Sequence, residues 1–231
     1  MKAAAILGVG GLGCPAALAL CEEAAAHGFA LRLVLIDPDV VERSNLARQI
    51  LFTERDVGSA KVEAAARRLS RSGVAIDARR ARFAPENAQE LLAGCEVLLD
   101  GTDAFETRFA ANDAACALGI PLVHGAVIGW SGQELSVLPG RGSCLRCLFE
   151  GPPPSGALPS CAEAGVLSPL CGVVGAAMAD DASRILRGLD PAAPATLRQW
   201  DGLRGRTRAV PVPRDPDCPA CGAPRAAIGH P

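Results

Sequence analysis

The 231-residue sequence lacks an excess of positive charge, since 23 lysines and arginines face 25 aspartates and glutamates for a net charge of -2. Domains that bind nucleic acid usually have an isoelectric point above roughly 9, so we expect no nucleic-acid partner. The sequence also lacks the run of about 18 apolar residues that a membrane helix requires. The apolar stretch that precedes the first glycines, residues 1–7, is too short for an export signal. We therefore expect a cytoplasmic protein without membrane contact.

Lysine is also scarce. Lys2 and Lys61 are the only lysines among the 23 basic residues, so each lysine stands where the chain did not use its usual arginine. Cysteine, in contrast, is frequent, with 10 residues. In a chain without an export signal, clustered cysteines indicate metal binding or catalysis rather than disulfides.

Strand-like and helix-like patterns alternate along the first 125 residues. Alternation of this kind predicts an α/β fold with a Rossmann-like, doubly wound, mostly parallel sheet. The expected strands cover 2–7, 31–36, 74–79, 96–99 and 120–124, and the expected helices cover 12–27, 60–69, 86–92 and 105–118. Beyond residue 125 we expect strands over 133–138, 196–200 and 207–212, a loop over 150–170, and a helix over 173–189.

A glycine-rich loop joins the first predicted strand to the first predicted helix. Gly8, Gly10 and Gly13 have the G-x-G-x-x-G spacing, which lets backbone N–H groups and a helix N-terminus hold phosphate oxygens. Asp37, at the end of the next strand, can accept hydrogen bonds from a ribose. The loop alone is equally compatible with a nicotinamide-dependent dehydrogenase, or with a tight turn that binds no ligand.

The polar segment after Asp37 favours ATP. The phosphates of ATP and a leaving pyrophosphate require side-chain cations and a metal ion, and Arg48 and Lys61 can supply that charge. Asp103 follows another predicted strand at the same sheet edge and is a candidate Mg²⁺ ligand, whereas Asp100 can instead cap the turn. Each of these side chains taken singly is a common surface charge, so the interpretation depends on their combination.

Two C-x-x-C pairs, Cys144/Cys147 and Cys218/Cys221, are separated by 70 residues. Two such knuckles predict a closed, tetrahedral and therefore structural Zn²⁺ site that holds the C-terminal segment beside the sheet. A redox dithiol at one pair and an iron–sulfur cluster are the alternatives.

These motifs together resemble the ThiF/MoeB/HesA family, the bacterial relatives of ubiquitin-activating enzymes. The resemblance rests on Gly-x-Gly-Gly-Leu-Gly-Cys, Asp-x-Asp-x-Val-x-x-Ser-Asn-Leu-x-Arg-Gln, the Lys-Val-Glu-Ala at 61–64, Thr102-Asp103 and the paired C-x-x-C motifs, and it covers nearly the whole chain. It implies one domain over 1–231, with a nucleotide-binding core over 1–125. The zinc site, a crossover loop and an antiparallel C-terminal extension would occupy 126–231.

The resemblance also implies an activity and its partners. Such enzymes are usually homodimers that use ATP and Mg²⁺ to adenylate the C-terminal glycine of a small ubiquitin-like sulfur carrier ending in Gly-Gly. They release pyrophosphate, and a sulfur-donor protein can follow in molybdopterin- or thiamine-type biosynthesis. The implied nucleotide site comprises Gly8, Gly10, Gly11, Gly13, Asp37, Asp39, Asn45, Arg48, Lys61, Asp103 and Ala104.

Arg48, Lys61 and Asp103 are the implied catalytic residues, and Cys161, in the expected crossover loop, is the candidate for a thioester or acyl-persulfide. Two departures are expected to matter. The family arginine that reaches into the partner subunit has no counterpart before Gly8, and Ala104 stands where asparagine is common. Arg108 is a candidate replacement cation. An impaired, scaffolding relative and a nicotinamide-dependent oxidoreductase are the alternative functions.

Overall fold

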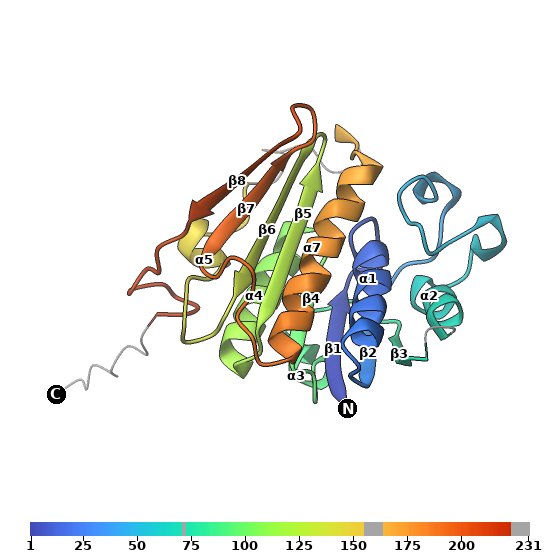
Figure 1. Cartoon of the computed structure of the whole chain (residues 1–231), viewed down its shortest axis with the longest axis horizontal. Coiled ribbons are helices and arrows are strands. Elements are labelled where there is room, and N and C mark those ends of the chain that lie inside the picture. Colours follow the sequence, from blue (N-terminus) through green and yellow to red (C-terminus); the bar gives the residue numbers. More distant parts are fainter. Residues whose placement is uncertain (71–72, 155–163, 223–231) are drawn as a thin grey trace.

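The computed structural model describes residues 1–70, 73–154 and 164–222. Eight strands form one sheet in the order β3-β2-β1-β4-β5-β6-β7-β8 (Figure 1). The five parallel strands are β1 (Lys2–Leu7), β2 (Leu31–Ile36), β3 (Ala75–Arg79), β4 (Val97–Asp100) and β5 (Leu122–Ile128). Antiparallel pairing then adds β6 (Ser131–Val137), β7 (Thr196–Asp201) and β8 (Arg206–Pro211). The predicted fold class is therefore confirmed, including the antiparallel extension.

Helices cover both faces of the parallel part of the sheet, which explains why β1 and β4 are apolar and buried along nearly their whole length. One face packs against α1 (Gly13–Ala26), α2 (Lys61–Leu69) and α7 (Ser168–Leu186), and the other against α3 (Ala88–Leu91), α4 (Phe105–Leu118) and α5 (Leu145–Leu148). Figure 1 shows α1 and α7 side by side on one face of the sheet. Gly175 permits this approach, because a Cβ there would lie 2.9 Å from the Leu12 carbonyl oxygen. None of the described helices is long and apolar enough to cross a membrane.

Three short 3₁₀ turns complete the described elements, at Arg43–Asn45, Glu54–Asp56 and Pro85–Asn87. The last of these is followed directly by α3, so the helix predicted over 86–92 is divided into two pieces. The parallel β1 and β4 are neighbours although β2 and β3 lie between them in sequence. Successive strands are therefore added on one side of β1 up to β3 and on its other side from β4 onward. Open α/β sheets bind ligands in the crevice at such a switch point, beyond the carboxyl ends of the strands.

Two predicted boundaries were wrong by four residues or more. β5 runs to Ile128 rather than ending at 124, because its second half pairs with β6 in an antiparallel hairpin. α7 begins at Ser168, within the predicted loop, because Pro169 occupies its first turn, where the missing N–H of proline costs no helical hydrogen bond.

A buried ionic cluster joins β6 and β7 to α7. Arg198 donates to Glu134 at 2.5 Å and to Asp181 at 3.0 Å. Ser136 Oγ lies 2.9 Å from Glu134 and 2.8 Å from Asp181, and its single hydroxyl proton can be donated to only one of these two carboxyl groups. Glu134 and Asp181 are almost completely buried. Burial raises the pKa of Glu134 to about 8, even though the hydrogen bond from Arg198 acts in the opposite direction. The cluster therefore binds a proton that the unfolded chain would release.

We expect this proton to make the free energy of unfolding fall as pH rises. Between the pKa of about 4.3 in the unfolded chain and about 8 in the folded one, the folded state holds more protons, which contributes a slope of up to about -1.4 kcal/mol per pH unit. Glu134→Gln should remove that contribution, measured by urea unfolding from pH 5 to pH 8. The exposed Glu63→Gln on α2 is the matched control. If the free energy of unfolding had the same slope against pH in wild type and in Glu134→Gln, the assignment of this proton to Glu134 would be contradicted.

Candidate active site

The glycine-rich loop turns sharply between β1 and α1. Gly8 has φ +83°, a conformation that favours glycine, and a Cβ on Gly13 would overlap the carbonyl oxygen of Gly8. Gly10 is open by comparison, since the nearest atom to a Cβ there is Gln49 Nε2 at 3.9 Å. Gly8 and Gly13 therefore shape the turn, whereas Gly10 leaves room for a ligand to approach the backbone.

Asp37 connects the end of β2 to this loop. Its two carboxylate oxygens accept the backbone N–H groups of Val9 at 2.7 Å and Asp39 at 2.8 Å. Burial raises the pKa of Asp37, and the nearby Lys61 charge and these hydrogen bonds partly offset the rise. Each oxygen retains a further lone pair, so the carboxylate can still accept a hydrogen bond from a ligand hydroxyl.

Lys61 begins α2 and is held by two carboxylates. Its Nζ lies 2.9 Å from Asp39 Oδ2 and 3.9 Å from Asp37 Oδ1, and only 8 % of its side chain is exposed. Buried lysines are rare unless they are paired, and this pairing places the ammonium at the carboxyl end of β2. Nearby, Arg48 donates to Asn45 Oδ1 at 2.7 Å, so the 3₁₀ turn that contains Asn45 fixes the direction of the guanidinium.

These groups surround a cavity of about 550 Å³ at the carboxyl ends of the parallel strands. Every residue predicted for the nucleotide site except Gly13 lines it: Gly8, Gly10, Gly11, Asp37, Asp39, Asn45, Arg48, Lys61, Asp103 and Ala104. The sequence did not identify Val166 and Cys171, which line it from the chain around the start of α7, or Arg80, Arg82 and Phe83 beyond β3. No motif marks these positions, because they reach the cavity only through the tertiary fold.

The turn after β4 supplies the opposite wall. Asp100 is completely buried and accepts both the backbone N–H and the hydroxyl of Thr102, as expected if it caps the turn. Asp103 is exposed, and no described residue makes a hydrogen bond or ion pair with its carboxylate. Arg108 on α4 is buried and donates two hydrogen bonds to the Thr102 carbonyl oxygen, at 3.0 and 2.9 Å.

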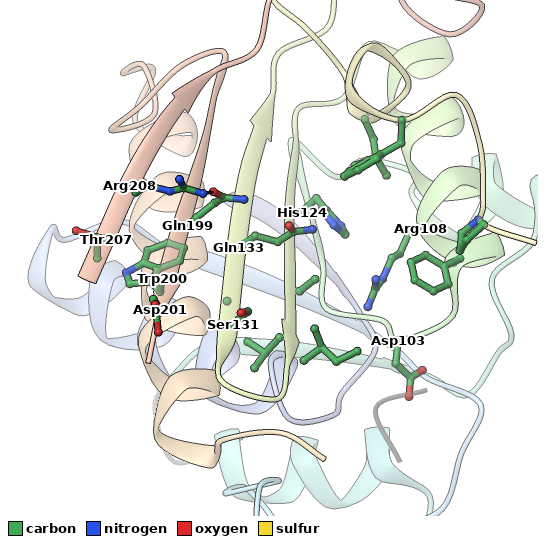
Figure 2. Close-up of a pocket in the computed structure, with 18 of the residues that line it drawn as sticks. Asp103, Arg108, His124, Ser131, Gln133, Gln199, Trp200, Asp201, Thr207 and Arg208 are labelled. Atoms are coloured by element: carbon green, nitrogen blue, oxygen red, sulfur yellow. Dashed lines mark hydrogen bonds between the residues drawn. The ribbon is translucent and has the colours of Figure 1, made fainter. Parts of the chain in front are cut away.

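A second, larger cavity of about 1010 Å³, which we call the trench, crosses the face of β5 to β8 that is remote from α7. Figure 2 shows Arg108, His124 and Asp103 at one end and Gln199, Trp200, Asp201, Thr207 and Arg208 at the other. Ala126, Gln133, Gln199 and Arg208 form one cross-strand row of its floor. Asp103, Arg108 and Val127 line both cavities, so the trench meets the first cavity at the turn after β4.

The four predicted metal ligands also come together. All four sulfur atoms lie within 4.8 Å of one another, with Cys144 Sγ 3.6 Å from Cys218 Sγ and Cys147 Sγ 3.4 Å from Cys221 Sγ. A tetrahedral ion with metal–sulfur bonds of about 2.3 Å requires sulfur separations of roughly 3.8 Å, so the four positions fit one. The backbone N–H groups of Cys144 and Asp215 also point to Cys147 Sγ, which suits a bound thiolate. Cys161 lies outside the described residues.

Comparison with known proteins agrees with this geometry. The family model described as "ThiF family" matches residues 2–220. The SAMP-activating enzyme E1 of Haloferax volcanii is 41 % identical over 219 residues, which cover 94 % of this chain and 79 % of that relative. The sulfur carrier protein adenylyltransferase of Thermus thermophilus is 42 % identical over 224 residues, covering 94 % and 81 %. The adenylyltransferase and sulfurtransferase MOCS3 of Sus scrofa is 41 % identical, covering 94 % and 47 %.

Solved structures support the fold independently. E. coli MccB crystallised with ATP superposes with a TM-score of 0.82 at 20 % identity, covering 96 % of this chain and 67 % of that one. At this identity the likeness concerns the fold alone. The family match spans nearly the whole chain, and three relatives from separate organisms exceed 40 % identity. The chain therefore belongs to the ThiF family, a family of adenylyltransferases.

Proposed function

We propose that this enzyme uses ATP to adenylate the C-terminal glycine carboxylate of a small ubiquitin-like carrier protein and releases pyrophosphate. The observation that supports this most strongly is the junction of the two cavities at Asp103, Arg108 and Val127. The smaller cavity combines a glycine loop with a lysine and an arginine, as a triphosphate requires. The trench runs over β5 to β8 and meets that cavity at one end, so an extended peptide tail bound along it would reach the nucleotide.

The proposed reaction depends on positioning and charge. The terminal carboxylate attacks the α-phosphorus while Arg48 and Lys61 stabilise negative charge on the phosphates, and no general base is required. Asn45 and Asp39 hold these two cations in place before the substrate arrives. Asp37 is the proposed acceptor for a ribose hydroxyl.

Two features of the nucleotide cavity fit a bound ligand and a Mg²⁺ ion. Asp103 offers an exposed carboxylate that no described side chain neutralises, and carboxylate oxygens are preferred Mg²⁺ ligands. Gln49 lines the same cavity, is 3 % exposed, and its amide oxygen has no hydrogen-bond partner among the described residues. When bound, Mg²⁺ would neutralise charge on the phosphates. Zn²⁺ is the proposed occupant of the four-cysteine site, because a closed set of four thiolates is characteristic of structural zinc.

Further parts of the proposal concern partners. The carrier is expected to end in Gly-Gly and to deliver sulfur in molybdopterin- or thiamine-type biosynthesis, with a sulfur-donor protein acting next. Cys161 is proposed as the residue that forms a thioester or acyl-persulfide with the carrier. A homodimer is the proposed assembly, as is usual in families of this kind.

Pyrophosphate exchange tests the proposed function. Purified protein with Mg²⁺, ATP, labelled pyrophosphate and a Gly-Gly-ended carrier should form labelled ATP, and omission of the carrier should abolish the signal. ATP binding without exchange for any such carrier would favour a scaffolding role. Tight NADH binding without ATP binding would instead favour an oxidoreductase.

A further inference from the structure

The trench contains a buried histidine that the nucleotide chemistry does not use. His124 lies in β5, is 1 % exposed, and lines the end of the trench nearest the nucleotide cavity. Its neighbours across the sheet are Asp100 on β4 and Leu135 on β6. Figure 2 shows its ring on the same side of the trench as Arg108 and Asp103. A polar ring is thus buried where the trench reaches the nucleotide cavity.

Asp100 fixes the orientation of this ring. His124 Nδ1 lies 2.8 Å from Asp100 Oδ2, while the other carboxylate oxygen of Asp100 accepts both hydrogen bonds from Thr102. Burial by itself would raise the pKa of Asp100, but the hydrogen bond from His124 and the positive charge of Arg108 outweigh it, so the pKa is lowered. An ionised carboxylate only accepts hydrogen bonds, and Nδ1 must therefore carry the proton.

The second ring nitrogen is left for a ligand. No described residue forms a hydrogen bond with the other ring nitrogen, Nε2. In the tautomer that carries its one proton on Nδ1, Nε2 is a hydrogen-bond acceptor. Because His124 lines the trench, Nε2 can accept a hydrogen bond from a ligand there that brings a donor. A tail that ends in glycines offers backbone N–H groups without side chains, and it would pass this atom before its carboxylate reached the nucleotide cavity.

We propose that His124 Nε2 accepts a hydrogen bond from the N–H of the last peptide bond of the carrier tail, and so directs the terminal carboxylate to the α-phosphate. This inference rests on the proposed function and extends it by assigning a tail-orienting residue. His124 contacts the carrier directly, and Asp100 is the positioning residue that sets its tautomer. ATP binding does not involve this contact.

His124→Asn is the sharpest variant, because its shorter amide can still donate to Asp100 but cannot reach the place of Nε2. We expect kcat/KM for the carrier to fall by about 5- to 10-fold, with KM for ATP and the melting temperature close to wild type. The exposed His27→Asn at the end of α1 is the matched control and should have wild-type kinetics. Unchanged carrier kinetics in His124→Asn would overturn the proposal.

A modified carrier identifies the donor. Replacement of the final glycine by glycolic acid converts the last peptide bond to an ester and removes its N–H while the length is kept. With the wild-type enzyme, kcat/KM should be about 5- to 10-fold lower for the ester carrier than for the unmodified carrier. With His124→Asn, the ester should lower kcat/KM little further, as a double-mutant cycle requires for interacting groups. If the losses in kcat/KM from the ester and from His124→Asn simply multiply, the proposed contact is overturned. It is also overturned if the wild-type enzyme uses the ester carrier as well as the unmodified carrier. Absence of exchange with the unmodified carrier in wild type would instead refute the proposed function.

Discussion

Asp103→Ala should reduce carrier-dependent pyrophosphate exchange by about 100-fold or more without a change in the free energy of unfolding. Loss of one group that stabilises transition-state charge typically costs a factor of 10²–10³. Stability should be preserved because Asp103 is exposed and no described residue makes a hydrogen bond or ion pair with it. The measurement pairs initial rates of exchange with a urea titration of the same samples.

Glu106→Ala is the matched control for this variant. Glu106 is an exposed carboxylate in the first turn of α4, three residues beyond Asp103, and it lines neither cavity. Its exchange rate should equal that of wild type. Normal exchange in Asp103→Ala would remove the assignment of this carboxylate to the phosphates and their Mg²⁺.

Lys61→Ala should also abolish exchange, but it is a less selective test. Lys61 is buried and pairs with Asp39 and Asp37, and removal of one partner leaves the buried Asp37 without its compensating charge. We therefore expect lost activity together with lower stability. ATP affinity measured by calorimetry at a temperature where the variant is folded separates the two effects, and wild-type affinity there would contradict the proposed contact.

Cys218→Ser should remove the bound metal and lower the melting temperature by roughly 6–12 °C. Structural zinc contributes roughly 10–16 kcal/mol of apparent binding free energy in small domains, and a loss of only about 3 kcal/mol shifts the melting temperature of a chain of this size by that amount. Cys218 is buried and follows β8, so the site holds the C-terminal segment against Cys144 after β6. Elemental analysis should give one zinc per wild-type chain and none in the variant.

Cys116→Ser is the matched control, because this thiol lies on α4 and interacts with the Cys144 thiol but is not one of the four cysteines that cluster. It should retain the zinc and nearly all of the stability. Stoichiometric iron in the wild-type protein would contradict the zinc assignment. If Cys116→Ser lost as much metal as Cys218→Ser, the four clustered thiols alone would be insufficient to hold the ion.

Local sequence patterns were sufficient to predict which residues lie together in the part of the site that follows β1, β2 and β4. Carboxyl ends of parallel strands meet at one sheet edge, so residues near Gly8, Asp37 and Asp103 could be expected to lie together once the strands were identified. The two C-x-x-C pairs were equally informative, because each knuckle brings two sulfur atoms close and four complete a tetrahedron.

The trench could not be predicted, because it depends on cross-strand register rather than on local pattern. Gln133 and Gln199 are neighbours only because β6 and β7, 66 residues apart at this position, pair antiparallel. Alternation predicted a strand near each of them but not which strands would be adjacent. The orientation of His124 likewise depends on Asp100, its partner on the neighbouring β4.

The boundary error in β5 has a tertiary cause. The second half of β5 contains Gly125, which has no intrinsic preference for a strand, yet tertiary packing requires glycine there, because a Cβ would clash with the Met178 side chain on α7. Arg108 was proposed from helical spacing alone. The structure places it in the lining of both cavities, which the sequence could not show because its direction is set by the Thr102 carbonyl oxygen.

Detection of the carrier adenylate tests the central claim most directly. The enzyme is incubated with Mg²⁺, ATP and a Gly-Gly-ended carrier, quenched in acid, and the carrier is weighed by intact-protein mass spectrometry. We predict a mass gain of one adenylyl group on the C-terminal glycine, with pyrophosphate as the other product and no gain on a carrier that lacks its last glycine. ATP consumption that releases orthophosphate and leaves the carrier unmodified would contradict the account.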